Sequence, residues 1–279
     1  MPARLLGQTI GGGKAEVLYL FPEPTSPGSF RALVRPGRKL KVGAAVELGG
    51  GERSRVLAVH PDGSRTMMLE GGTNVLDLLF KLGHLPLPPY IDRADRPLDQ
   101  ERYQTVYACE PGSVAAPTAG LHFTERLLDQ VRSKGVHVHE ILLHVGPGTF
   151  ARVDADNIAD HRVLPEAFHV PSETAEAYER ARIRGSRVIA VGTTTVRALE
   201  TAVHDASLTA GPGKTDLVIL PGHRFRAVDA LLTNFHLPKS SLLFLVSAFA
   251  GIDEIRAAYA EAIRTRYRFY SYGDAMFIH

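Results

Sequence analysis

The chain has 279 residues, of which 44% are hydrophobic and 22% charged, as in an ordinary globular protein. Its formal net charge of +2 is too small to indicate a nucleic-acid partner by itself. The longest uncharged apolar stretch, residues 240–252, is shorter than the roughly 20 residues of a membrane-spanning helix. The single cysteine, Cys109, excludes an intramolecular disulfide and favours a reducing compartment. We therefore expect a cytoplasmic protein without a membrane span.

The first hundred residues contain short segments that are rich in β-forming side chains and are bounded by Gly, Pro or Asp-Gly. Several short strands at regular spacing predict a small barrel. We expect a small β-barrel domain over residues 1–85, followed by a proline-rich linker over 86–104. The predicted strands are 14–21, 29–35, 44–49, 53–60 and 64–71, with a short helix at 75–82.

From about residue 105 the pattern changes to alternating helices and strands. Such alternation predicts an α/β main domain, here 105–279, with helices on the faces of a sheet. The predicted helices are 123–135, opened by Thr124, 172–185, 196–204, 240–251 and 253–267. The predicted strands are 136–146, 187–192, which is of the buried parallel type, and 215–221.

Two glycine turns follow predicted strands and are candidate ligand sites. Residues 187–192 lead into Thr193, Thr194 and Thr195 at the start of a helix. A helix N-terminus with adjacent hydroxyls can bind a carboxylate or phosphate, although an ordinary capped turn is an equal alternative. The second turn, 144–150, superficially resembles the glycine loop of methyltransferases, but it has no acidic residue at His144 and no third glycine.

Several polar residues in the second half are candidates for acid-base chemistry. His122 precedes a predicted helix and could shuttle protons, although a structural hydrogen bond is the commoner role of such a histidine. Residues 228–242 place Asp229, Asn234, His236 and Lys239 in a predicted loop between apolar segments. Residues 266–276 alternate aromatic side chains with arginines and contain Asp274 near their end. These aromatics could be part of the core, or they could stack on a purine.

Two further patterns concern metals and nucleic acids. His137 and His139 alternate along a predicted strand, but no further ligands accompany them at a recognisable spacing, so we expect no metal. Residues 30–55 contain an excess of Lys and Arg, which is the electrostatic pattern of a phosphate-binding face, although such runs are more often solvated surface.

Nine segments, in the same order, resemble the S-adenosylmethionine:tRNA ribosyltransferase-isomerase family of queuosine biosynthesis. They extend from residue 33 to near the C-terminus. They are 33–43, 83–91, 101–108, 112–124, 144–150, 187–200, 215–225, 228–242 and 266–276.

The resemblance implies a fold and an activity. The fold is an α/β main domain with a small inserted β-barrel. The activity is transfer and isomerisation of the ribosyl group of S-adenosylmethionine onto 7-aminomethyl-7-deazaguanine at the wobble position of tRNA, which gives epoxyqueuosine and releases adenine and methionine. The implied partners are this tRNA and S-adenosylmethionine as a co-substrate. No cofactor or metal is implied, and we expect a monomer.

This chemistry requires positioned acid-base groups. The sulfonium acidifies the C5′ hydrogens of the sugar, so a base must remove one, and the departing adenine needs a proton or a hydrogen bond. The catalytic candidates are His122, His144, Asp229, His236 and Asp274. The substrate-binding candidates are Gly146, Gly148, Thr149, Thr193, Thr194, Thr195, Arg197, Asn234, Lys239 and Tyr272, with Arg197 or the 192–195 turn holding the methionine carboxylate. The candidates for tRNA phosphate are Arg35, Arg38 and Lys39.

One departure from the family leaves rival hypotheses open. Family members normally begin several dozen residues earlier, with an Asn-Asp-Thr-Arg run that leads into the stretch here read as residues 1–5. We therefore expect an unpaired edge of the main sheet and a partly open pocket. The short start leaves a non-catalytic tRNA-binding form as an alternative. An S-adenosylmethionine-dependent tRNA methyltransferase is a separate alternative, because it uses the same co-substrate.

Overall fold

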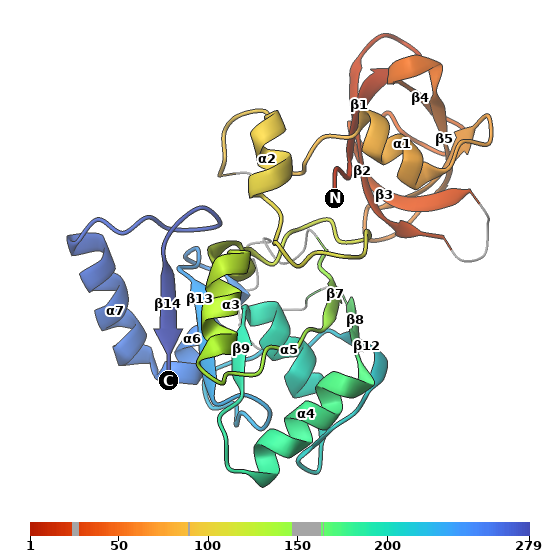
Figure 1. Ribbon diagram of the computed structural model, residues 1–279. Coiled ribbons are helices and arrows are strands. Elements are labelled where there is room, and N and C mark those ends of the chain that lie inside the picture. Colours follow the sequence, from red (N-terminus) through yellow and green to blue (C-terminus); the bar gives the residue numbers. More distant parts are fainter. Residues whose placement is uncertain (24–27, 89, 147–162, 164) are drawn as a thin grey trace. The chain divides into compact units, whose positions relative to one another are not determined.

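The computed structural model describes residues 1–23, 28–88, 90–146, 163 and 165–279 (Figure 1). They divide into two compact units. The first unit contains Met1–Glu101 and Pro111–Ala115, and the second contains Arg102–Glu110 and Ala116–His279. Together they show the mixed α and β character that the sequence predicts.

The first unit is a closed barrel of six strands, in the order β1-β2-β3-β6-β5-β4, and all neighbours are antiparallel. Alternate side chains of its strands point inward and are buried. The barrel therefore confirms the strand spacing read from the sequence. Its strands are β1 (Arg4–Thr9), β2 (Lys14–Pro22), β3 (Ser29–Arg35), β4 (Ala45–Leu48), β5 (Arg53–Val59) and β6 (Arg65–Glu70).

The strand β1 closes the barrel and was not among the predicted strands. It pairs with β2 on one side and with β4 on the other. Strands β1 and β4 approach so closely that a Cβ built on Gly7 of β1 would lie 2.3 Å from the backbone oxygen of Glu47 in β4. Glycine is therefore required at a position where its low strand propensity weakens the sequence signal.

Helix α1 (Val75–Leu82) lies against the barrel and has the bounds that the sequence predicts. The Asn74 side chain caps it by accepting a hydrogen bond from the Leu76 N–H at 2.8 Å. Leu78 and Leu79 of this helix are buried in the barrel core. The first unit also contains the 3-10 turn η1 (Gly49–Gly51) and helix α2 (Pro97–Arg102) up to Glu101, whereas Arg102 is assigned to the second unit.

The second unit contains two three-stranded sheets and a short hairpin of β10 (Val203–His204) and β11 (Ser207–Leu208). One sheet, in the order β12-β8-β7, is antiparallel. The other, in the order β14-β13-β9, pairs β13 with β9 in parallel and with β14 in antiparallel fashion. The strands of these sheets are β7 (Leu142–His144), β8 (Glu166–Val170), β9 (Ile189–Val191), β12 (Gly211–Thr215), β13 (Ala230–Asn234) and β14 (Ala275–Ile278).

The helices of this unit follow the predicted pattern closely. Thr124 caps its helix by accepting the Leu127 N–H at 3.1 Å, and Ser240 accepts the Leu243 N–H at 3.3 Å. The helices pack around a core built from both sheets. They are η2 (Thr118–His122, a 3-10 turn), α3 (Glu125–Ser133), α4 (Ser172–Ile183), α5 (Thr193–Ala202), α6 (Ser241–Ala250) and α7 (Ile252–Arg264).

Three sequence predictions for this unit are corrected. The strand predicted at 136–146 is restricted to Leu142–His144. The segment 216–221, predicted as part of a strand, is irregular: Leu217 and Ile219 pack into the core, but the segment does not pair with another strand that the structure describes. An apolar run in the sequence does not show whether the buried segment is paired in a sheet. The predicted loop 228–242 contains β13, the central strand of its sheet, so Asn234 ends a strand.

No helix formed by the described residues has the length and apolarity required to cross a membrane.

Candidate active site

The parallel strands β9 and β13 end at the same edge of their sheet. The N–H of Gly192, directly after β9, donates to the carbonyl of Leu232 in β13 at 2.9 Å. Gly192 has a φ of 93° and starts α5 without a side-chain cap. A Cβ built on Gly192 would contact the Cβ of Ala119 in η2 at 3.7 Å. This edge, where ligands bind in open α/β sheets, therefore brings together the β9–α5 turn, the end of β13 and η2.

Asn234, the last residue of β13, connects three elements through its buried amide. Its Oδ1 accepts a hydrogen bond from the hydroxyl of Thr118 at 3.2 Å. Its Nδ2 lies 2.9 Å from Nε2 of His122 and donates to the carbonyl of Tyr270 at 3.2 Å. The structure thus places two predicted site residues, His122 and Asn234, in direct contact.

Asp274 lies at the same edge, because its neighbour Ala275 is the register partner of Asn234. Its carboxylate accepts the backbone N–H of Arg268 at 2.7 Å and the Arg268 guanidinium at 3.3 Å. The backbone hydrogen bond is the main cause that lowers the pKa of Asp274, and the Arg268 side chain and His122 add to it. Asp274 is therefore a stable anion near the histidine.

Burial lowers the pKa of His122 below its usual 6.5, because desolvation disfavours the imidazolium. The charge of Asp274 opposes this effect but is smaller. His122 is consequently neutral at pH 7.

The aromatic residues near this edge support η2 and the 266–276 segment. Tyr107 lies under Gly120 of η2, where a built Cβ would be only 2.0 Å from the Tyr107 hydroxyl oxygen. Burial raises the pKa of Tyr107 to about 12, so this hydroxyl stays protonated. Tyr103 lies 3.2 Å from the Ser271 hydroxyl and meets the ring of Tyr272 edge to face at 5.4 Å. Tyr272 is 39% exposed, which leaves part of its surface open.

The threonines of α5 differ in their environment. The hydroxyl of Thr195 donates to the carbonyl of Val191 at 2.8 Å, so it is committed to its own backbone. Thr193 and Thr194 are buried at the helix start. The backbone N–H groups of this first turn carry the positive end of the helix dipole.

Arg197 is buried on the second turn of α5. Its Nε donates to the carbonyl of Leu217 at 2.9 Å and its Nη1 forms an ion pair with Glu166 of β8. Its Nη2 is buried and has no hydrogen-bond partner among the residues that the structure describes. Glu166 also accepts the N–H of Gly146 at 3.2 Å. Glu166 was not among the predicted site residues, and no local motif marks it.

Asp229, a predicted catalytic residue, lies at the opposite end of β13 from Asn234. It pairs with Arg182 at 2.7 Å and accepts the N–H of Val188 at 2.7 Å. These contacts connect α4 to the start of β13. The structure does not bring Asp229 to the His122 cluster.

His236 lies two residues beyond Asn234 and its side chain contacts Thr233, with Nε2 at 3.0 Å from the hydroxyl. Its backbone N–H donates to the hydroxyl of Tyr259 at 2.7 Å. Burial lowers the pKa of His236 to about 4, so it is neutral in the folded protein. Lys239 is exposed and adopts a φ of 56°.

The remaining predicted residues lie in the other sheet or beyond the described part of the chain. His144 ends β7, where it is the register partner of Ala167 in β8. Gly148 and Thr149 lie outside the described residues.

In the first unit, the predicted phosphate-binding residues Arg35, Arg38 and Lys39 are exposed around the β3–β4 connection. Buried Arg65 holds this connection by donating from Nε to the carbonyl of Leu40 and from Nη2 to that of Gly37, both at 2.9 Å. The three exposed cations form no ion pair with a carboxylate of the described residues.

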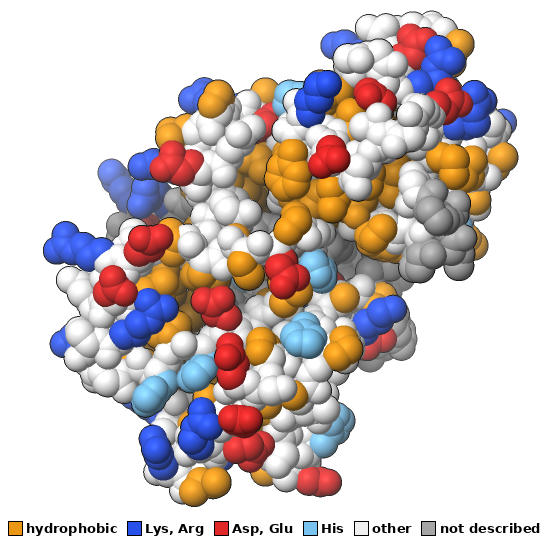
Figure 2. All heavy atoms as spheres, turned by 45° about the vertical axis from the view of Figure 1, so that its right-hand side comes forward, with side chains coloured by type: hydrophobic (Ala, Val, Ile, Leu, Met, Phe, Trp, Pro, Cys, Tyr) orange, Lys and Arg blue, Asp and Glu red, His pale blue; other side chains and the backbone are white. Residues whose placement is uncertain are grey.

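The two arginines of β5, by contrast, are paired. Arg53 lies 3.0 Å from Glu47, and Arg55 binds Glu70. Figure 2 likewise shows positive and negative side chains interspersed over the face in view. The β3–β4 connection therefore differs from these paired sites in its free positive charge.

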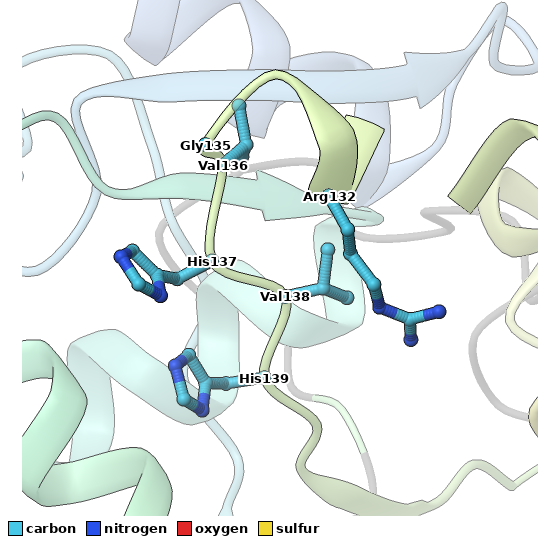
Figure 3. A pocket seen from close by; sticks show the side chains of 6 residues that line it. All are labelled: Arg132, Gly135, Val136, His137, Val138 and His139. Atoms are coloured by element: carbon cyan, nitrogen blue, oxygen red, sulfur yellow. The ribbon is translucent and has the colours of Figure 1, made fainter. Parts of the chain in front are cut away.

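A shallow cavity of about 290 Å³ lies beyond the end of α3 and is lined by Arg132 and residues 135–139. His137 and His139 point to one side of the chain, and Val138 points to the other (Figure 3). The two imidazole rings are 6.4 Å apart, at an interplanar angle of 22°. Among the described residues, no group of three or more His, Cys, Asp or Glu side chains could hold a metal ion.

Comparisons with known proteins identify the family of the chain. The sequence profile of the family described as "Queuosine biosynthesis protein" matches residues 1–278. The chain is 52% identical, over its full length and 81% of the relative, to a protein of Moorella thermoacetica named S-adenosylmethionine:tRNA ribosyltransferase-isomerase. It is 37% identical to the chain in a crystal structure of an S-adenosylmethionine tRNA ribosyltransferase from Thermotoga maritima, covering 100% of this chain and 78% of that one with a TM-score of 0.49. The chain therefore belongs to the queuosine biosynthesis protein family, that of the S-adenosylmethionine:tRNA ribosyltransferase-isomerases.

Proposed function

We propose that the chain transfers and isomerises the ribosyl group of S-adenosylmethionine onto 7-aminomethyl-7-deazaguanine at the wobble position of tRNA. The products are epoxyqueuosine in the tRNA, free adenine and methionine. Family membership supports this reaction. The observation that supports its location is the contact between His122 and Asn234 beside Asp274, at the carboxyl edge of β9 and β13.

In this proposal the co-substrate binds across that edge. The first turn of α5, which has no side-chain cap, is suited to the methionine carboxylate, because its N–H groups and helix dipole favour an anion. Arg197 already pairs with Glu166, so it would contribute through its remaining donor, Nη2. The half-exposed ring of Tyr272 offers a surface on which a purine could stack.

The protein then has three catalytic tasks in this reaction. A base takes a C5′ proton that the sulfonium has acidified, and the electron pair of the C1′–N9 bond leaves with adenine. Methionine departs as a neutral thioether. These tasks are removal of the proton, stabilisation of the adenine leaving group and placement of the reacting atoms. The reaction proceeds without a covalent protein intermediate.

The tRNA backbone would contact the barrel at Arg35, Arg38 and Lys39. Exposed cations without carboxylate partners are available to phosphate groups, whereas the paired arginines of β5 are already neutralised. A cytoplasmic monomer is consistent with the single cysteine, Cys109, and with a tRNA substrate.

The decisive experiment incubates the chain with S-adenosylmethionine and tRNA that carries the deazaguanine precursor, and separates the products by chromatography. We expect adenine and methionine to appear in equal amounts. S-adenosylhomocysteine instead would identify the alternative methyltransferase. Bound tRNA without adenine release would identify a non-catalytic form.

Alanine variants test the residues. We expect at least one of His122→Ala, His236→Ala and Asp274→Ala to reduce turnover by about 100-fold, the usual contribution of an acid-base group. If all three retain turnover within a few-fold of the unmodified chain, the assignment of the catalytic residues is wrong.

A further inference from the structure

The orientation of the Asn234 amide is fixed by its neighbours. The carbonyl oxygen of Tyr270 can only accept a hydrogen bond, so the Asn234 atom 3.2 Å away must be the NH2 group. The hydroxyl of Thr118 then donates to Oδ1 at the other side of the amide. The flipped amide would place two carbonyl oxygens against each other and is therefore excluded.

This orientation determines the protonation of His122. One N–H of Nδ2 is used by Tyr270, and the other points at His122 Nε2 across 2.9 Å. A protonated Nε2 would set two donors against each other, so Nε2 must carry its lone pair. The proton of the neutral ring is consequently on Nδ1.

We propose that Asn234 holds His122 as the Nδ1–H tautomer, and that His122 serves the reaction as a hydrogen-bond donor through Nδ1 and not as its base. The second half of this inference rests on the proposed function. Asn234 is in these terms a positioning residue, and its buried amide, 3% exposed, has every hydrogen-bonding group satisfied.

The available donor, Nδ1, has no hydrogen-bond partner among the residues that the structure describes. The charged group that acts on the ring is Asp274, which is itself paired with Arg268, and the nearby phenol of Tyr107 stays neutral. An imidazole N–H that has no partner among the described residues is available to an acceptor nitrogen of a purine.

The leaving group in the proposed reaction offers such an acceptor. When the C1′–N9 bond breaks, its electron pair enters the adenine ring, and a hydrogen bond to a ring nitrogen stabilises that charge. The imidazole keeps its proton, because a neutral ring that lost Nδ1–H would become an imidazolate. The C5′ proton goes to another group, for which the ionised Asp274 lies at this edge. Adenine takes a proton from water, and the hydroxide that remains is neutralised by the proton that came from C5′.

The tautomer can be measured without any turnover, by long-range 1H–15N NMR of protein with 15N-labelled histidine. We expect His122 to show a protonated Nδ1 and an unprotonated Nε2 at pH 7. Its signals are assigned by their loss in His122→Asn. A protonated Nε2 in the unmodified chain would overturn the inference.

Asn234→Asp tests the cause. A carboxylate next to Nε2 accepts a proton where the amide donates one, so the proton should move to Nε2 or the ring should become cationic. Asn74→Asp changes an amide in the same way at the cap of α1 and should leave the His122 signals unchanged. Unchanged His122 signals in Asn234→Asp would show that Asn234 does not set the tautomer.

Substitution of His122 separates a donor from a base. The side-chain amide of asparagine places an N–H close to the position of Nδ1 but cannot act as a base. We expect His122→Asn to release adenine within about tenfold of the unmodified chain, and His122→Ala to lose about 100-fold. Equal losses would overturn the donor role. Absence of adenine release from the unmodified chain would instead refute the proposed function. The tautomer of His122 measured by NMR would remain valid, because it does not depend on activity.

Discussion

Arg197 of α5 and Glu166 of β8 form a buried ion pair that connects a helix to the loop after β7. One oxygen of Glu166 binds the guanidinium, and the other accepts the N–H of Gly146 at 3.2 Å. The side chains are only 6% and 9% exposed. Gly146, two residues after β7, and the helix after β9 are thereby connected through Glu166.

Loss of one partner should be costly, because it leaves a buried charge without compensation. We expect Arg197→Met to lower the free energy of unfolding by about 3 kcal/mol, measured by urea denaturation. Arg256→Met removes the exposed partner of Asp253 and should change stability little. In the double variant Arg197→Met/Glu166→Leu, we expect much of the loss to be recovered. A stable single variant would show that the pair is not buried as described.

The barrel cations should set the salt dependence of tRNA binding. We expect Arg38→Gln/Lys39→Gln to reduce the slope of log affinity against log salt by about 1 to 2, because each phosphate contact contributes about 0.7 to 0.9. Arg53→Gln/Arg55→Gln removes the same charge from arginines paired with Glu47 and Glu70 and should change the slope less. Equal effects would place the tRNA elsewhere.

Gly120 should be intolerant of a side chain. Gly120→Ala puts a Cβ 2.0 Å from the Tyr107 hydroxyl and 2.7 Å from Thr105 Cγ2, so η2 must shift together with His122. We expect a loss of stability of about 1 to 3 kcal/mol and a fall in adenine release. Adding Tyr107→Phe removes the closest atom and should restore part of both. Gly11→Ala, where nothing lies within 4 Å, is the control.

Desolvation of the His236 imidazole should make stability depend on pH. Its pKa is lowered to about 4 in the folded protein against about 6.5 when unfolded, so the unfolded chain binds the extra proton between these values. Stability should therefore be full above pH 6.5 and fall by up to about 3 kcal/mol as the pH drops toward 4. His236→Gln should flatten this dependence in urea denaturation at pH 5 and 7.5, whereas exposed His204→Gln should not.

The pH profile of turnover should report His122. Since burial lowers its pKa, kcat/KM for S-adenosylmethionine should persist as the pH falls below 6.5. In the unmodified chain, a proton on Nε2 would face the donating Asn234 amide, whereas in Asn234→Asp a carboxylate accepts it and Nδ1–H is kept, so the acid limb should be lost. An acid limb at the same pH in both proteins would mean that another group controls it.

The sequence predicts the local elements of this fold well and the long-range pairing poorly. Helix α1 and the cap at Thr124 follow from short-range signals that act within one turn. By contrast, β13 contains a polar residue, Asn234, that satisfies its amide through Thr118 and Tyr270, which are distant in sequence. From sequence alone, a polar residue of this kind predicts a loop, because the partners that allow it to be buried in a strand are not visible.

The candidate site shows the same division. The β9–α5 turn is visible in the sequence as a strand, a glycine and a helix, and the contact of His122 with Asn234 joins residues that were each proposed separately. The position of Asp229 could not be predicted, because the expected loop 228–242 hid a strand that separates Asp229 from Asn234. Glu166 was missed because its role depends on the ion pair with Arg197, which is distant in sequence.

Arg65 has a consequence for the tRNA binding that we propose for the barrel. Because its guanidinium is committed to the carbonyls of Gly37 and Leu40, the backbone beneath Arg38 and Lys39 is rigid before any encounter. Association then restricts only the side-chain rotamers, at about 0.5 to 1.5 kcal/mol each, and no loop has to be ordered. An internal arginine that never touches RNA would in this way govern how fast and how tightly the outer ones engage it.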